Sequence, residues 1–212
     1  MSVPELTHPS VADIREEDLV DRLLSDVYSR SNYFELHGLP RGMLNKQRVS
    51  LNKAPGESKG DIDVLSCAPG RPEEAVAFEV KRIKFGVSAL RPGGRPNKLQ
   101  EFAKAVQQAN RLAQLGFWQV YLYVIVVVDA REQNAGRLTY EGLSSELQYL
   151  VSSTITLEGL DKRVGLCDLD FTQPMDYAPL TVGTGGLHLH RLSTPALQSA
   201  ELTTWVKDIF SK

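Results

Sequence analysis

Three charged side chains interrupt two apolar segments that otherwise have the composition of buried strands. Asp63 lies in the first segment, 60–65, and Glu79 and Lys81 lie in the second, 75–81. Strand side chains alternate between faces, so Glu79 and Lys81 share one face, and Asp63 can reach that face from the neighbouring segment. An unpaired buried charge is costly, so this grouping requires a ligand or a partner. Two converging carboxylates are hard oxygen ligands suited to Mg²⁺, and the nearby ammonium can hold a water or an anionic oxygen.

A loop rich in Pro and Gly at 69–72 joins the two segments, which predicts a β-hairpin. The pattern resembles the PD-(D/E)xK nuclease superfamily, in which an acidic residue on one strand precedes (Asp/Glu)-x-Lys on the next. Asp63 and Glu79-Val80-Lys81 match this signature, whereas Ile62 stands where the name of the family has Pro. The resemblance implies an α/β protein with a restriction-endonuclease-like fold.

The resemblance also implies a chemistry for each residue of the motif. Asp63 and Glu79 would hold Mg²⁺, with Mn²⁺ as a substitute, and the carbonyl of Val80 would be a further ligand. Lys81 would position the attacking water and stabilise the pentavalent oxyanion. We therefore expect a nuclease that hydrolyses phosphodiesters, above all DNA, in phage defence, restriction or repair. The alternative is a catalytically idle subunit of the same fold that binds nucleic acid or supports an assembly; the intact Asp/Glu/Lys set argues against it.

A helix is predicted over 14–28 from apolar residues at 14, 19, 20, 23, 24 and 27. At about 100° per residue, Glu16 falls within the apolar stripe and Glu17 falls on its flank. The run 16–23 is similar to the first helix of archaeal Holliday-junction resolvases, with Glu16 in the acidic position. Glu16 is therefore expected to complete the catalytic set through a water, with Glu17 as the competing acid. A charged first turn that complements the helix dipole is the structural alternative.

The remaining core elements follow the motif in the order that the resemblance implies. An amphipathic helix is predicted over 97–115, and an apolar strand over 118–129 should be covered on both faces. The first core strand is assigned to 48–51, with 33–36 as its competitor. The expected αβββαβ order gives a central mixed sheet flanked by helices.

Two regions are expected: residues 1–135 as the nuclease-like core and 136–212 as an α+β extension packed on it. In the extension, a helix is expected over 143–150 and short strands over 163–171 and 187–192. Between those strands lies the turn-rich segment 183–186. A helix over 195–211 should direct its apolar side chains inward: Leu197, Leu202, Trp205, Val206 and Ile209.

The charge distribution favours contact with a phosphate backbone near the motif. The net charge is only −2, but segment 41–98 holds 12 Lys and Arg against 6 Asp and Glu, which gives it +6 and the remainder −8. From position 81 to 98 there are six basic residues and no acid. We expect nucleic-acid contacts there, against the alternative of a solvated loop; the candidates are Arg82, Lys84, Arg91, Arg95 and Lys98.

Other residue types point to no competing chemistry. His188 and His190 share a strand face, but without an evident third ligand they favour a polar surface over a metal site. Cys67 and Cys167 are expected to be buried free thiols, which fits a reducing cytoplasm. No signal-peptide pattern opens the sequence, and the apolar run 118–128 is too short for a bilayer, so no membrane partner is expected. A homodimer or a larger complex stays open.

Overall fold

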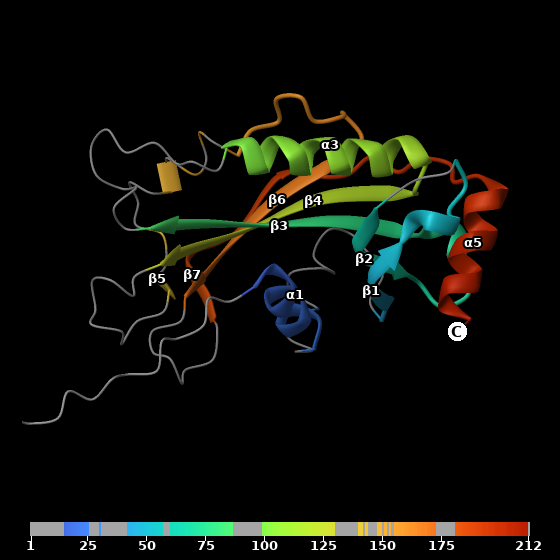
Figure 1. The fold of residues 1–212 in the computed structure, drawn as a ribbon, viewed down its shortest axis with the longest axis horizontal. Helices are drawn as coiled ribbons and strands as arrows, with labels where there is room; N and C mark the ends of the chain where they lie inside the picture. The colour runs from blue at the N-terminus through green and yellow to red at the C-terminus, as the bar shows by residue number, and fades with distance from the viewer. Residues whose placement is uncertain are drawn as a thin grey trace, which may run out of the picture.

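The computed structural model describes residues 15–25, 30, 42–56, 60–86, 99–129, 140–141, 143, 148–149, 151, 153, 155–172 and 181–211. Within these residues the chain is an α/β protein, with an open mixed sheet and helices packed against it (Figure 1). The helices are α1 (Glu16–Ser25), α3 (Leu99–Leu115) and α5 (Ala200–Phe210). The strands are β1 (Leu44–Ser50), β2 (Asp61–Cys67), β3 (Val76–Gly86), β4 (Gln119–Asp129), β5 (Tyr140–Glu141), β6 (Gly165–Thr172) and β7 (Thr181–Arg191).

The main path of the sheet runs β1-β2-β3-β4-β6-β7, with β5 paired to β4 beside it. Strands β1, β2 and β3 are antiparallel neighbours, β3, β4 and β6 are parallel, and β7 returns antiparallel to β6. The predicted order of helix, three strands, helix and strand is therefore confirmed. The first core strand is β1, which contains most of the expected 48–51; the competing segment 33–36 lies outside the described residues.

Helices pack on both faces of the sheet. Leu19, Val20 and Leu23 of α1 join one apolar cluster with Phe78 of β3 and Tyr121 of β4. Helices α3 and α5 close the other cluster. Because both faces are covered, residues 119–128 of β4 are all buried, which explains why this strand is apolar without alternation.

Helix α3 is the crossover that parallel β3 and β4 require. Its buried residues recur at helical spacing, and Gly116 ends it with a positive φ of 88°. The predicted start at 97 lies outside the described residues. None of the described helices has the length and apolarity needed to cross a bilayer.

The C-terminal segment both lengthens the sheet and closes its core. Strands β6 and β7 extend the sheet, and Leu202, Trp205 and Val206 of α5 enter the same cluster as α3. Cys67 and Cys167 are buried free thiols, as predicted, and burial raises the pKa of Cys67 to about 11.

Two expectations about this segment were wrong. Residues 183–186 lie within β7 instead of forming a turn. Leu169 pairs with Leu187 and Phe171 pairs with Val182, so β6 advances two residues while β7 advances five, and the irregular register accommodates the glycines. Leu197 is fully exposed because it precedes the helix: α5 begins at Ala200, where the Ser199 hydroxyl accepts the N–H of Leu202.

Candidate active site

The candidate site lies where β2 separates from β3. The ladder between them runs from Ser66↔Val76 to Val64↔Phe78, and one further step would set Asp63 opposite Glu79. Beyond that point β3 continues along β4 as far as Gly86. Asp63 and Glu79 therefore lie directly past the last pair of the ladder, where the paired strands open into a notch, and the charge of Asp63 acts on Glu79.

Acidic side chains replace β2 as hydrogen-bond acceptors along this edge of β3. The N–H of Val80 donates to Asp63 Oδ2 at 2.7 Å, and the N–H of Arg82 donates to Glu16 Oε2. Alternate N–H groups of a strand point to the same side, so the two carboxylates occupy successive acceptor positions. Backbone donors thus fix both acids at the notch, and Glu16 also ties the first turn of α1 to β3.

Lys81 and Glu79 are the side chains of β3 that serve the same site. Lys81 Nζ lies 3.2 Å from Glu16 Oε2 and 3.4 Å from Oε1. Their side chains are 27% and 32% exposed, so the pair is accessible from solvent. Glu79 is only 4% exposed, which is unusual for a carboxylate. The predicted residues Glu16, Asp63, Glu79 and Lys81 are therefore brought together, from α1, β2 and β3.

Burial and mutual repulsion both disfavour the charged forms of Asp63 and Glu79. Burial raises the pKa of Glu79 to about 9, with the charges of Asp63 and Glu16 adding to it and Lys81 opposing it. Burial also raises the pKa of Asp63 to about 6, against the N–H of Val80 and the charge of Lys81, while Glu16 and Asp61 raise it further. A cation placed between these carboxylates would relieve both effects.

The donor set fits a magnesium ion that shares its coordination with substrate and water. Across the described residues, no group of three or more His, Cys, Asp or Glu side chains forms a metal cluster. Mg²⁺ does not require one, because it is usually held by one or two carboxylates together with phosphate oxygens and waters. Asp63 and Glu79 are two neighbouring carboxylates with raised pKa values, which is the type of ligand that such a site would use. The main-chain role predicted for Val80 stays a prediction; its N–H is bound to Asp63.

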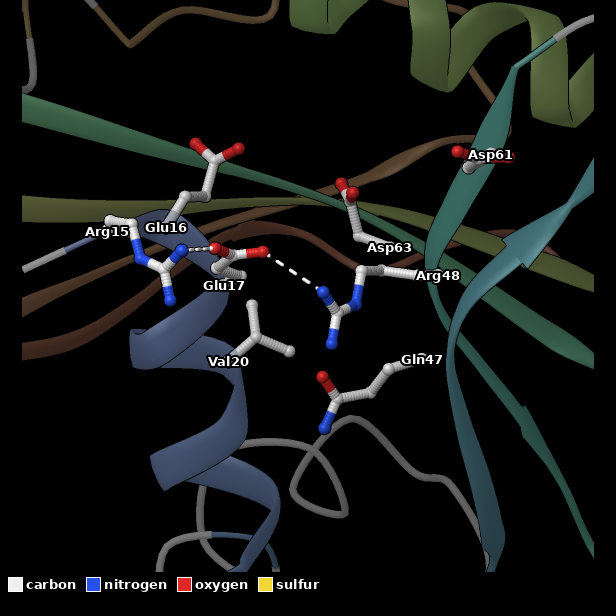
Figure 2. Close-up of a pocket in the computed structure, with 8 residues that line it drawn as sticks. All are labelled: Arg15, Glu16, Glu17, Val20, Gln47, Arg48, Asp61 and Asp63. Atoms are coloured by element: carbon white, nitrogen blue, oxygen red, sulfur yellow. Dashed lines mark hydrogen bonds and ion pairs between the residues drawn. The ribbon is translucent and has the colours of Figure 1, made fainter.

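A pocket of about 360 Å³ opens beside the notch (Figure 2). The structure distinguishes the two acids at the start of α1 here. Glu16 turns to Lys81, whereas Glu17 pairs with Arg15 and with Arg48 of β1, whose Nη1 lies 3.1 Å from Glu17 Oε2. The pocket is lined by Arg15, Glu16, Glu17, Val20, Gln47, Arg48, Asp61 and Asp63.

The basic residues expected to contact nucleic acid are only partly described. Arg82 contributes its N–H to the notch, as above. Lys84 Nζ lies 3.4 Å from Asp129 Oδ2, so an acid at the end of β4 neutralises this ammonium. Arg91, Arg95 and Lys98 lie outside the described residues, so their expected contacts stay predictions.

Two polar features were missed from the sequence. Arg48 has φ +50°, a left-handed conformation inside β1, and periodicity carries no signal of it. Asp168, 3% exposed in β6, pairs with His190 of β7. Here a signal existed, since Asp168 and Asp170 alternate through an apolar strand. His190 is thus on a polar strand face, as expected, but with an acidic partner.

Two comparisons, with protein-family models and with curated proteins, give no relative for this chain. No protein-family model matches the chain, and a search of curated proteins finds no significant match.

Proposed function

We propose that this protein is a metal-dependent nuclease of the PD-(D/E)xK type, with a restriction-endonuclease-like core, and that it hydrolyses phosphodiester bonds in DNA. One observation carries the proposal: Asp63 and Glu79 lie just past the last pair of the β2–β3 ladder, close enough for the charge of Asp63 to raise the pKa of Glu79, with Lys81 on the same strand as Glu79. The order of elements from α1 to β4 supports the fold assignment.

The raised pKa values favour a charged ligand over a purely structural role. Structural acids in a core are usually neutralised by a basic partner. Here the one ammonium described at the notch, Lys81, lies against Glu16 at 3.2 Å. Asp63 and Glu79 keep elevated pKa values despite it, which is the electrostatic environment expected of a cation-binding site.

Each residue then has a distinct role. Asp63 and Glu79 would hold Mg²⁺ or Mn²⁺. When bound, the ion supplies Lewis-acid charge against the phosphate oxygens and lowers the pKa of water. Lys81 positions the attacking water and donates to the phosphate oxygen on which negative charge develops. Glu16 accepts from Lys81 Nζ and from the N–H of Arg82, so it holds the ammonium at the mouth of the notch.

A cleavage assay tests this proposal directly. Plasmid, linear duplex and single-stranded DNA, with RNA for comparison, would be incubated with the purified chain in Mg²⁺, Mn²⁺ or EDTA. Cleavage should need the metal and be lost in Asp63→Asn, Glu79→Gln and Lys81→Ala. Glu73→Gln is a matched control, because Glu73 is an exposed acid in the turn before β3, at the far end of the same hairpin.

Calorimetric titration with Mn²⁺ separates a nuclease from an idle subunit of the same fold. We expect Asp63→Asn and Glu79→Gln to lose Mn²⁺ binding while they remain folded, and Lys81→Ala to keep it. Unchanged Mn²⁺ affinity in both acid variants would refute the metal site. A protein that binds both Mn²⁺ and DNA but never cleaves would support the idle subunit instead.

A further inference from the structure

The β1–β2 ladder turns sharply at the pair Arg48 and Asp63. Gln47 pairs with Val64, and Val49 pairs with Ile62, so Arg48 stands opposite Asp63. Val64 packs in the cluster under α1, whereas Ile62 and Val49 pack in the cluster under α3. Residues two apart on a regular strand share a face, so the strands twist at this pair. The left-handed φ of +50° at Arg48 accompanies the twist.

A non-glycine residue in this conformation is strained, and such strain persists only where the surroundings enforce it. Glycine would adopt the same φ without cost. The backbone preference of arginine therefore does not explain why Arg48 occupies this position. The explanation must come from its side chain.

The guanidinium of Arg48 lies in the pocket beside the notch, together with Glu16 and Asp63 (Figure 2). Its side chain is 65% exposed, and it reaches Glu17 through Nη1 at 3.1 Å. Arg15 also meets Glu17, but Asp18 holds Arg15 by two further bonds, from Nε at 3.0 Å and from Nη2 at 2.9 Å. Arg48 is thus the arginine of this pocket that can turn to a ligand by giving up a single exposed ion pair.

We propose that Arg48 binds a backbone phosphate of the nucleic acid next to the scissile one, and that Glu17 occupies its guanidinium until the substrate arrives. This inference rests on the proposed nuclease function. Arginine presents a planar fork that matches phosphate oxygens, and an exposed ion pair is weak enough to exchange for that contact. Phosphate contacts fix the register of a protein on its substrate, so Arg48 is a positioning residue at the entrance to the site.

Binding measurements on four variants test the assignment. The full chain would be titrated with a labelled DNA duplex in EDTA over a range of salt concentrations. Arg48→Gln should weaken binding about tenfold, as expected for a lost hydrogen bond to a charged group. It should also reduce the salt slope, which is the magnitude of the change in log binding constant per unit of log salt concentration, by about 1. Glu17→Gln should have the opposite effect and tighten binding, because it frees Arg48 and removes a negative charge from the phosphate path.

Two further variants separate charge from backbone strain. Arg48→Gly removes the guanidinium but suits the positive φ, so it should bind as weakly as Arg48→Gln while unfolding at a higher temperature. Arg71→Gln is the matched control: it removes another exposed arginine, 55% exposed, from the turn between β2 and β3, and should bind like the wild type.

The outcomes distinguish this inference from the proposed function. If the wild type cleaves and binds DNA but Arg48→Gln matches Arg71→Gln in affinity and salt slope, the Arg48 assignment is wrong and the nuclease stands. If Arg48→Gly binds like the wild type, Arg48 acts through strand geometry alone, which also overturns it. A wild type that neither binds nor cleaves any nucleic acid removes both proposals.

Discussion

At the scale of residues, the acids of the notch differ in what neutralises them. Glu16 has the ammonium of Lys81 and the N–H of Arg82, and Asp63 has the N–H of Val80. Glu79 is the most buried of the three, and its pKa is raised further than that of Asp63. Burial is therefore the main cause of the raised pKa of both Asp63 and Glu79, and a backbone donor opposes it at Asp63.

These shifts predict how stability changes with pH in the absence of metal. The pKa of Asp63 rises from 3.8 to about 6 on folding, and that of Glu79 from 4.5 to about 9. Between the unfolded and folded values the native state binds more protons, so the free energy of unfolding falls as pH rises. The contribution of these two groups to the free energy of unfolding is thus greatest below about pH 4 and is lost progressively up to about pH 9. Thermal unfolding across this range, in EDTA, measures it.

The double variant Asp63→Asn with Glu79→Gln should flatten this part of the pH profile, while Glu73→Gln should keep it. Mg²⁺ should raise the melting temperature of the wild type most at the alkaline end, where both acids are charged. An unchanged alkaline loss of stability in the double variant would show that these two acids do not cause it.

Lys81 gives a second prediction at this scale. Lys81→Ala should abolish cleavage and leave DNA affinity within about threefold, because the ammonium is paired with Glu16 beforehand and acts mainly on the charge that develops in the transition state. Lys162→Ala, an exposed lysine in the segment before β6, serves as the control and should cleave normally. Gel assays of cleavage and anisotropy of binding decide it; a large loss of affinity without loss of turnover would contradict the role.

At the scale of elements, Glu16 adds a polar link between α1 and β3 to the apolar packing between them. Glu16→Ala leaves the N–H of Arg82 without its carboxylate acceptor, which should cost about 1–3 kcal/mol of unfolding free energy. Glu16→Gln retains an acceptor oxygen and should lose less. Denaturant unfolding gives the energies, and hydrogen exchange of the Arg82 amide should accelerate in Glu16→Ala. If Glu17→Ala accelerates that amide equally, the effect belongs to α1 as a whole and not to Glu16.

At the scale of the whole molecule, the C-terminal helix is part of the main core. Trp205 is 8% exposed and meets Phe117 at a centroid distance of 6.3 Å, and Gln198 Nε2 donates to the carbonyl of Pro72 at 2.8 Å. The last helix therefore reaches the segment after α3, and Gln198, just before the helix, reaches the turn between β2 and β3, which is the turn of the motif hairpin.

Trp205→Ala should lower the unfolding free energy of the entire chain by about 3–5 kcal/mol, and unfolding should remain a single transition. Lys207→Ala, exposed on the same helix, should change stability by less than about 0.5 kcal/mol. Circular dichroism and tryptophan fluorescence would follow the transition. Two separated transitions would instead indicate that residues 136–212 fold independently.

Most of the elements were predictable because their signals are local. The alternation around Glu79, the continuous apolar run of β4 and the helical spacing of α1 and α3 each depend on neighbours within a few residues. The charged residues of the hairpin were conspicuous for the same reason, since three charges in two apolar segments violate the pattern around them. Local patterns along the chain are therefore sufficient to predict the α/β class, the order of elements and the candidates Asp63, Glu79 and Lys81.

Tertiary structure alone decided where the strands separate and what fills the opening. The end of the β2–β3 ladder at Val64↔Phe78, the choice of Glu16 over Glu17 and the pairing of Asp168 with His190 all join residues far apart in the chain. The left-handed backbone of Arg48 likewise depends on the twist between β1 and β2. Such contacts are set by register and packing, which no local period encodes. The notch and the pocket beside it could therefore be located only in the folded molecule.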